Sequence, residues 1–127
     1  MLTGRAILLI LMSVALSAVA QIAFKTGMMQ PGVQAALPLL TADWRGPLTI
    51  ARNLYVLFGL VCYATSAGIW LLVLARVNLS VAYPFVGLGF ILTMVAGAIL
   101  FREPVTWLRV VGTLLVCAGV VLVARSA

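Results

Sequence analysis

The sequence predicts an all-α integral membrane protein with four transmembrane helices, and two observations lead to this fold class. Of the 127 residues, 65% are hydrophobic and only 8% are charged, whereas a soluble domain has about 45–50% apolar and roughly 25% charged residues. The few charges also divide the chain into long uncharged runs, and a bilayer-spanning helix needs about 20 mostly apolar residues. So few charged side chains cannot cover a water-facing surface, which argues against a soluble enzyme.

The uncharged runs predict spans over residues 5–25, 54–75, 79–100 and 105–124 in a single transmembrane domain. Helices are expected because backbone polar groups in lipid must be satisfied within the segment, and the runs lack the alternation of a membrane barrel. The first span has a second interpretation, as a signal peptide with small residues at a cleavage site. The three further spans favour a retained first helix.

The connections between the spans differ in length. Residues 26–53 form a long loop whose prolines and glycines disfavour one regular helix, although a short turn at the membrane interface is expected within it. The other two connections are tight, so successive spans are expected to be antiparallel neighbours in a four-helix sheaf. Pro104 fits the first turn of the last helix, and Glu103 fits the positive end of its dipole. The positively charged residues are similar in number on both sides, which leaves the membrane orientation open.

The charged and reactive residues exclude several kinds of site. The net charge of +6 is spread over eight Lys and Arg residues, a pattern typical of headgroup contact and not of nucleic-acid binding. The chain has no His, and its two acids, Asp43 and Glu103, lie outside the uncharged runs. We therefore expect no catalytic residue, no metal site and no cofactor. Cys62 and Cys117 lie within apolar runs, so two buried free thiols are favoured over a disulfide or redox pair.

A polar stripe is predicted along the first span. Ser13, Ser17, Gln21 and Lys25 recur every four residues, which places them on one helix face. In a functional interpretation the stripe lines a substrate path, and Lys25 at the membrane boundary binds a phosphate group. The alternative is that Ser and Gln join neighbouring helices by hydrogen bonds while Lys25 extends to the headgroups.

Aromatic residues suggest a second wall of the same path. In the second span, Tyr63, Ser66 and Trp70 follow at helical spacing. Such aromatic side chains can hold a sugar, a cation or a polyprenyl chain. The alternative is plain packing between helices, and the sequence favours the cavity role for Tyr63 and Trp70.

Proline and glycine residues mark a possible hinge and a possible interface in the last two spans. Pro84, next to Tyr83, removes a backbone N–H early in the third span, and Gly87 permits bending, as an alternating-access carrier requires. A proline simply tolerated near a helix start is the alternative. Gly112 and Gly119 share a face of the fourth span, which predicts a dimer seam, with packing inside one chain as the alternative.

These residues resemble a known group of transporters. The whole chain resembles the four-helix branch of the drug/metabolite transporter superfamily. Residues 111–120 resemble the dimerising helix of small multidrug resistance exporters, and residues 23–25 (Ala-Phe-Lys) resemble their Leu-Met-Lys run. The resemblance implies a small multidrug resistance-like fold and a dimer. Those exporters couple drug to protons through a membrane-embedded Glu two turns before that Lys, and the matching position here is Ser17.

The closer resemblance is to the subunits of the 4-amino-4-deoxy-L-arabinose-phosphoundecaprenol flippase. It is carried by residues 17–21 (Ser-Ala-Val-Ala-Gln), 70–74 (Trp-Leu-Leu-Val-Leu), 82–84 (Ala-Tyr-Pro) and 103–105 (Glu-Pro-Val). It implies transfer of an undecaprenyl-phosphate-linked sugar between the leaflets of a bacterial inner membrane. It also implies a homodimer or a heterodimer with a paralogous subunit, in parallel or antiparallel arrangement.

The expected binding residues follow from this substrate. A lipid phosphate is anionic, so charge-assisted contacts are expected from Lys25, Arg52 or Arg102. The sugar is expected to pass along Ser13, Ser17, Gln21, Tyr63, Trp70 and Tyr83. Two other functions stay open from sequence alone, which are export of a small solute or drug and a non-transporting subunit that stabilises a membrane partner.

Overall fold

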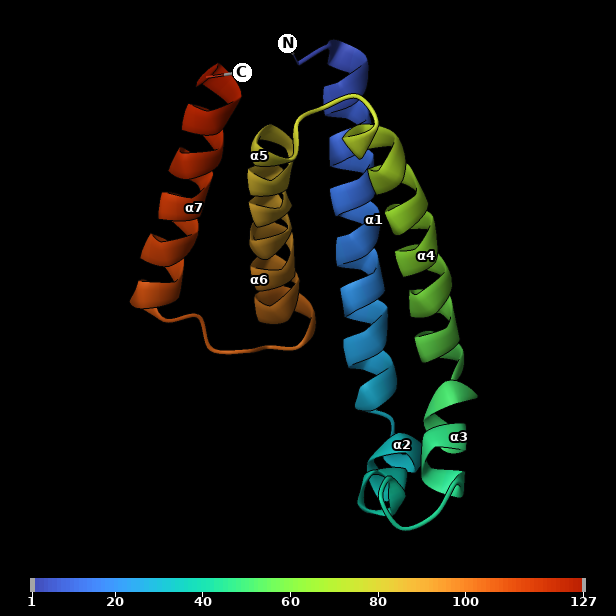
Figure 1. Cartoon of the computed structure of the whole chain (residues 1–127). Helices are drawn as coiled ribbons and strands as arrows, with labels where there is room; N and C mark the ends of the chain where they lie inside the picture. The colour runs from blue at the N-terminus through green and yellow to red at the C-terminus, as the bar shows by residue number, and fades with distance from the viewer. Residues whose placement is uncertain (1, 127) are drawn as a thin grey trace.

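The computed structural model describes residues 2–126, which contain helices and no strands. Four segments are long and apolar enough to cross a membrane, namely Gly4–Met28, Leu54–Leu74, Leu79–Leu100 and Trp107–Ser126. The first two are α1 and α4, and the last is α7 (Figure 1). The third runs through α5 (Leu79–Ala82), η2 (Tyr83–Gly87) and α6 (Leu88–Leu100). The prediction of an all-α, multi-pass membrane protein is thus confirmed.

Two polar side chains fix the starts of the first two membrane helices. The Thr3 hydroxyl accepts a hydrogen bond from the Ala6 N–H at 3.3 Å, and Asn53 Oδ1 accepts from the N–H groups of Tyr55 and Val56 at 3.0 and 3.2 Å. Such caps satisfy backbone donors that have no partner within the helix. Each cap therefore places the first turn of its helix at a defined residue.

The connection between α1 and α4 is made of short helical pieces. They are α2 (Pro31–Ala36), η1 (Leu37–Leu39) and α3 (Arg45–Ala51), so the segment is not one regular helix. α3 packs closely on η1 because Gly46 has no side chain, and a Cβ there would lie 2.8 Å from the carbonyl carbon of Leu39. Trp44 projects outward between these pieces with 69% of its surface exposed, as an interfacial anchor would.

The third span changes its helical form at its proline. The segment Tyr83–Gly87 is a 3₁₀ turn between the α-helical parts α5 and α6. Pro84 lacks the N–H of a regular α-helix, and a 3₁₀ segment inside a longer helix often marks strain or a hinge. The predicted hinge residues, Pro84 and Gly87, therefore lie within the irregular turn.

The order of the helices differs from the expected sheaf of sequential neighbours. α1 packs against α4 on one side and against α6 on the other, and α7 packs against η2 and α6. The helices consequently form a row in the order α4, α1, α5–α6, α7 (Figure 1). The short loop after α4 carries the chain past α1, and Val77 of this loop packs on the core around Ile10. The prediction that the second and third spans lie side by side was wrong.

Close packing of α1 on α4 explains this order. A Cβ at Gly59 would lie 2.6 Å from the Phe24 ring and 3.1 Å from the Ala20 carbonyl oxygen. A Cβ at Gly27 would likewise lie 2.8 Å from Val56. Small residues let helix backbones approach closely in membranes. The tightest helix pair is therefore α1–α4, and the third span is left to occupy the opposite side of α1.

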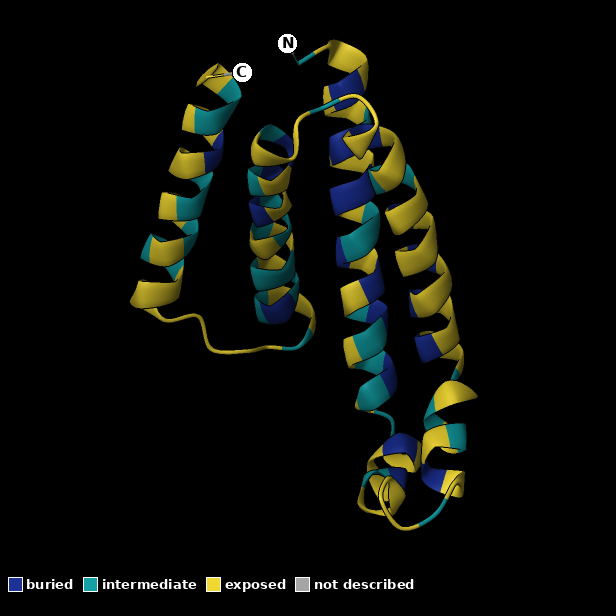
Figure 2. Cartoon of the chain, in the orientation of Figure 1, coloured by how far each residue is buried: buried dark blue, intermediate teal, exposed yellow. Residues whose placement is uncertain are grey.

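Burial decreases along the row from α1 to α7. In the most apolar part of α1, 33% of residues are buried inside the chain, but in that of α7 only 6% are. Figure 2 shows α7 almost entirely in the colours of exposed and intermediate residues. Its apolar side chains face the surroundings, as side chains in contact with lipid or a partner helix do.

The last helix begins later than the sequence suggested. α7 starts at Trp107, and residues 102–106 form an irregular connection, so Pro104 is not in its first turn. The Thr106 hydroxyl accepts from the Arg109 N–H at 3.4 Å and takes the place of a cap. Glu103 instead turns back to the preceding helix, where its N–H donates to the Gly97 carbonyl at 3.0 Å. The expected role of Glu103 at the helix dipole was therefore wrong.

Candidate functional site

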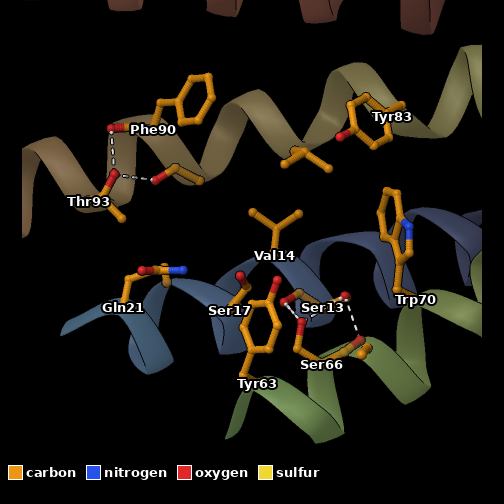
Figure 3. Close-up of a pocket in the computed structure, with 14 residues that line it drawn as sticks. Ser13, Val14, Ser17, Gln21, Tyr63, Ser66, Trp70, Tyr83, Phe90 and Thr93 are labelled. Carbon is orange, nitrogen blue, oxygen red and sulfur yellow. Dashed lines mark hydrogen bonds between the residues drawn. The ribbon is translucent and has the colours of Figure 1, made fainter. Parts of the chain in front are cut away.

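A pocket of about 610 Å³ lies between α1, α4 and the third span. It is lined by three polar residues of α1 and by Tyr63, Ser66 and Trp70 of α4, with Tyr83, Phe90 and Thr93 on the opposite wall. Figure 3 shows the labelled side chains of α1 and α4 gathered on the side that faces the third span. The volume falls within the range of about 300–1,000 Å³ that is usual for small-ligand sites.

The polar stripe of α1 runs from the protein interior toward its surface. Ser13 is buried, Ser17 is half-buried and Gln21 is exposed, and all three line the pocket. Their spacing of four residues places them on one helix face because an α-helix has 3.6 residues per turn. Lys25 continues this face but is not among the pocket residues.

Ser13 and Ser66 join α1 to α4 at the base of the pocket. The Ser13 hydroxyl donates to the Ser66 carbonyl at 3.0 Å, and the Ser66 hydroxyl donates to the Ser13 carbonyl at 2.8 Å. Their side-chain oxygens lie 3.2 Å apart (Figure 3). Ser13 therefore joins two helices by hydrogen bonds, as the alternative interpretation of the polar stripe expected. It also borders the pocket.

Aromatic side chains form much of the remaining wall. Tyr63 comes from α4 and packs at a tilt against Phe24, with ring centroids 6.3 Å apart. Trp70 and Tyr83 lie toward one end of the pocket (Figure 3). Phe90 completes the group from α6. Rings of this kind present both an apolar face and, in Tyr and Trp, a polar edge.

Three hydroxyl groups of the wall, those of Ser13, Ser66 and Thr93, offer lone pairs to the cavity, whereas those of Ser17, Tyr63 and Tyr83 donate to no described residue. Thr93 donates its proton to the Gly89 carbonyl at 2.9 Å, and the protons of Ser13 and Ser66 are used in the pair described above. A hydroxyl that has donated its proton keeps acceptor capacity. None of the described residues that line the pocket is charged at neutral pH. The pocket therefore suits an uncharged ligand that carries both hydrogen-bond donors and acceptors, such as a hydroxylated sugar.

The basic residues expected at the site lie outside this pocket. Lys25 Nζ lies 3.2 Å from Glu103 Oε1 and 5.9 Å from the centre of the Phe101 ring. Arg52 follows α3 and is exposed. Arg102 is exposed in the loop after α6, with a φ of 53° in the left-handed region. The structure brings together six of the nine expected binding residues, and these three cations are the others.

The predicted hinge and seam glycines have different surroundings. A Cβ at Gly87 would lie 2.5 Å from Val116 Cγ1, so α7 approaches the irregular turn closely at this point. By contrast, no atom of the described chain comes within 4 Å of a Cβ placed at Gly112 or Gly119. Packing within one chain therefore does not account for these two glycines.

Sequence reasoning missed Phe90 and Thr93 as pocket residues. Tyr83, Val86, Phe90 and Thr93 follow one another at intervals of three and four residues, which is the periodicity of a single helix face. Because most residues of the third span are apolar, the face that lines the pocket differs little in polarity from the other faces. The hydroxyl of Thr93 was the available signal.

Comparison with known proteins decides the family. The family model described as Small Multidrug Resistance protein matches residues 49–116, which is more than half of the chain. The chain belongs to the Small Multidrug Resistance protein family. The predicted family resemblance is thereby confirmed.

Within this family, the chain is similar to proteins named as flippase subunits. It is 34% identical to a probable 4-amino-4-deoxy-L-arabinose-phosphoundecaprenol flippase subunit ArnF of Shewanella sediminis, covering 96% of this chain and 89% of that protein. A probable subunit ArnF of Sodalis glossinidius is 33% identical, covering 92% and 88%. A probable subunit ArnE of Pseudomonas aeruginosa is 41% identical over 68% and 70%. No solved structure matches the chain.

Proposed function

We propose that this member of the Small Multidrug Resistance family is a subunit of a bacterial inner-membrane flippase. Its substrate is a sugar linked to undecaprenyl phosphate, of the 4-amino-4-deoxy-L-arabinose type. Relatives named as subunits of such a flippase match nearly the whole chain, and the four spans fit a protein that acts within the bilayer. The proposal is transport between leaflets and not catalysis.

The observation that carries the proposal is the uncharged pocket between α1, α4 and the third span, lined by hydroxyl, amide and aromatic groups. In hydrocarbon, polar side chains usually face a partner helix or a cavity and mark a substrate path. The hydroxyl groups of a sugar require hydrogen-bond partners during their passage through the membrane, because an unsatisfied polar group there costs several kcal/mol. Ser17, Gln21 and Tyr63 offer such partners, and Trp70 and Tyr83 offer ring faces.

The remaining expected residues have subsidiary roles in this proposal. Pro84 and Gly87 allow the third span to change shape, so that the pocket opens to one leaflet and then to the other. Lys25, Arg52 and Arg102 attract anionic lipid to the boundary, although the Lys25 charge is shared with Glu103. Four helices in a row enclose the pocket on one side only. A second copy or a paralogous subunit would complete it, with Gly112 and Gly119 at the seam.

Export of a cationic drug is the second candidate, because the family name favours it. The residues disagree with the usual coupling of drug to protons, since neither acid of the chain, Asp43 or Glu103, lies within a membrane-spanning helix. A cation in the pocket would find aromatic faces but no carboxylate. The structure therefore favours the sugar substrate over the drug.

The test is a translocation assay in proteoliposomes with a defined undecaprenyl-phosphate-linked sugar. Gln21→Leu removes an exposed amide from the pocket, and we expect translocation to fall by about tenfold, as for the loss of one hydrogen bond worth about 1.4 kcal/mol. The matched control is Thr65→Val, which removes a hydroxyl of α4 that does not line the pocket, and we expect a change below about twofold. If a paralogous subunit is needed for activity, it is reconstituted together with each variant.

Equal rates for the wild-type protein and Gln21→Leu would contradict the role of the pocket. The same vesicles are loaded with a fluorescent cationic drug as a second arm. Drug export without movement of the lipid-linked sugar would replace the proposed function with the alternative. Correct folding of each variant is checked by its elution as a single species in detergent.

A further inference from the structure

A second cavity lies on the other side of α6, in a groove between α6 and α7. Its volume is about 580 Å³, and apolar residues form most of its walls. These apolar residues are Phe90, Met94, Ala98, Val105 and Val116. Glu103 and Arg109 lie at the end of the groove where the chain passes from α6 to α7. The groove thus combines a long apolar surface with two charged groups at one end.

Arg109 supplies the available positive charge of this groove. One guanidinium nitrogen donates to the Pro104 carbonyl at 2.9 Å, and the group has five N–H donors in total. The two salt bridges found among residues 2–126 join Lys25 to Glu103 and Arg45 to Asp43, and neither includes Arg109. The remaining guanidinium donors are therefore able to bind an anion.

Glu103 also lines the groove, but its charge is paired with that of Lys25 on α1. Its Oε1 lies 3.2 Å from Lys25 Nζ, and a Cβ at Gly97 would lie 2.9 Å from its Oε2. The carboxylate is thus held against the end of α6 in contact with a cation of its own. The pair also reduces the ability of Lys25 to bind a phosphate, so Lys25 and Arg109 are not equivalent.

We infer that the α6–α7 groove binds the phosphate and the adjoining isoprenoid units of the carrier lipid, with Arg109 holding the phosphate. The inference rests on the proposed function and names the second half of its binding site. Charge complementarity supports it, since a guanidinium pairs with phosphate through two parallel hydrogen bonds. The apolar walls suit a prenyl chain, whose burial from water is favourable.

Continuity with the sugar pocket supports the same assignment. Phe90 and Thr93 line both cavities, so a single helix face separates them. In Figure 3 the Phe90 ring projects from the side of α6 away from α1. The described residues that line the sugar pocket include no cation, whereas those of the groove include Arg109. The groove and the sugar pocket consequently adjoin, as the direct bond between the sugar and the phosphate requires.

The experiment measures lipid binding by native mass spectrometry of the full chain in detergent. The probes are undecaprenyl phosphate, uncharged undecaprenol and dioleoyl phosphatidylglycerol. We expect Arg109→Gln to weaken binding of undecaprenyl phosphate by about tenfold or more, because a charge-assisted contact is lost. Undecaprenol binding should stay within about twofold, because it has no phosphate to lose. Arg109→Lys should recover part of the lost affinity because the charge returns without the planar fork.

Two control variants separate Arg109 from the other cations. Arg125→Gln removes a charge at the opposite end of α7, and Lys25→Gln removes the cation of the ion pair. Arg125→Gln should leave undecaprenyl phosphate binding within about twofold of the wild-type value. Lys25→Gln should weaken it less than Arg109→Gln does, because Arg109 remains and only the Glu103 charge loses its partner. A tenfold loss in Lys25→Gln together with none in Arg109→Gln would overturn the assignment. If Arg109→Gln weakened the binding of phosphatidylglycerol and of undecaprenyl phosphate equally, the assignment would also be overturned, since the site would then recognise negative charge and not the prenyl chain.

A third variant tests the groove itself. Ala98→Phe fills the apolar wall, and we expect it to weaken undecaprenyl phosphate and undecaprenol alike. If it changes dimer content and neither lipid affinity, a partner helix occupies the groove and the inference fails. The assay needs no transport, so its result is independent of the proposed function. Lipid binding through Arg109 without movement of the lipid-linked sugar would contradict only the proposed flippase function. Transport unaffected by Arg109→Gln would contradict only the assignment of Arg109 to the phosphate.

Discussion

The hydroxyl groups on one face of α1 have two different environments, one turn apart. Ser13 is 3% exposed and exchanges hydrogen bonds with Ser66, whereas Ser17 is half-buried and borders the pocket. Among the described residues, the Ser17 hydroxyl has no hydrogen bond to a neighbouring helix like those that Ser13 makes. The first residue therefore contributes to helix association, and the second remains available to a ligand.

This difference predicts unequal effects on stability. The double variant Ser13→Ala, Ser66→Ala should lower the free energy of unfolding by about 1 kcal/mol, because two interhelical hydrogen bonds disappear. Ser17→Ala should change it by less than about 0.5 kcal/mol. The measurement is reversible denaturation in mixed micelles followed by circular dichroism. Equal losses for the two variants would contradict the assignment of Ser13 and Ser66 as the joining pair.

At this scale, the sequence predicts helix faces but not ion pairs. The four-residue spacing was enough to place Ser13, Ser17 and Gln21 on the face that lines the pocket. It gave no information on Lys25 and Glu103, which meet at 3.2 Å only because α6 packs beside α1. A contact between distant segments depends on the tertiary arrangement, and a single sequence has no periodicity that encodes it.

The packing of α1 on α4 is the element-scale feature on which the pocket depends. α4 carries one glycine in this interface, Gly59, and another, Gly68, that faces open space. At Gly59 a Cβ would lie 2.6 Å from the Phe24 ring, and at Gly68 no atom is within 4 Å. One helix therefore provides both the test position and its control.

Substitution of the two glycines by alanine should have opposite effects. Gly59→Ala should destabilise the protein by about 1–3 kcal/mol, as overpacking forces the helices apart. Gly68→Ala should be neutral or should stabilise it by up to about 1 kcal/mol, because alanine favours the helix. Thermal unfolding in detergent measures both. A Gly59→Ala variant as stable as Gly68→Ala would show that α1 and α4 are not in close contact there.

The helices themselves were predictable, but their order was not. Runs without charge fix where the chain crosses the bilayer, and Pro84 marks the irregular turn of the third span. Tight loops only require that the ends of successive helices be near each other. The order in the row was decided by Gly27 and Gly59, whose neighbours on the facing helix are not apparent from the sequence.

At the scale of the whole molecule, the polar pocket lies between α1, α4 and the third span. At the end of the row of helices, α7 is exposed (Figure 2). A Cβ placed at Gly112 or Gly119 would meet no atom of the described chain within 4 Å beyond the backbone of α7 itself, although Gly112 borders the α6–α7 groove. An open pocket and an uncovered helix are both expected of a subunit that functions with a second one. The central claim is that the polar stripe of α1 faces a water-filled crevice and not a dry contact between helices.

Cysteine accessibility tests this claim most directly. In a chain with Cys62→Ala and Cys117→Ala, single cysteines are introduced as Ser17→Cys, Gln21→Cys and Ser13→Cys, and proteoliposomes are treated with a membrane-impermeant maleimide. We expect Ser17→Cys and Gln21→Cys to react, and we expect lipid-linked sugar to slow both reactions. The buried Ser13→Cys should react far more slowly. Absence of labelling at Ser17→Cys and Gln21→Cys from either side of the membrane would contradict this claim.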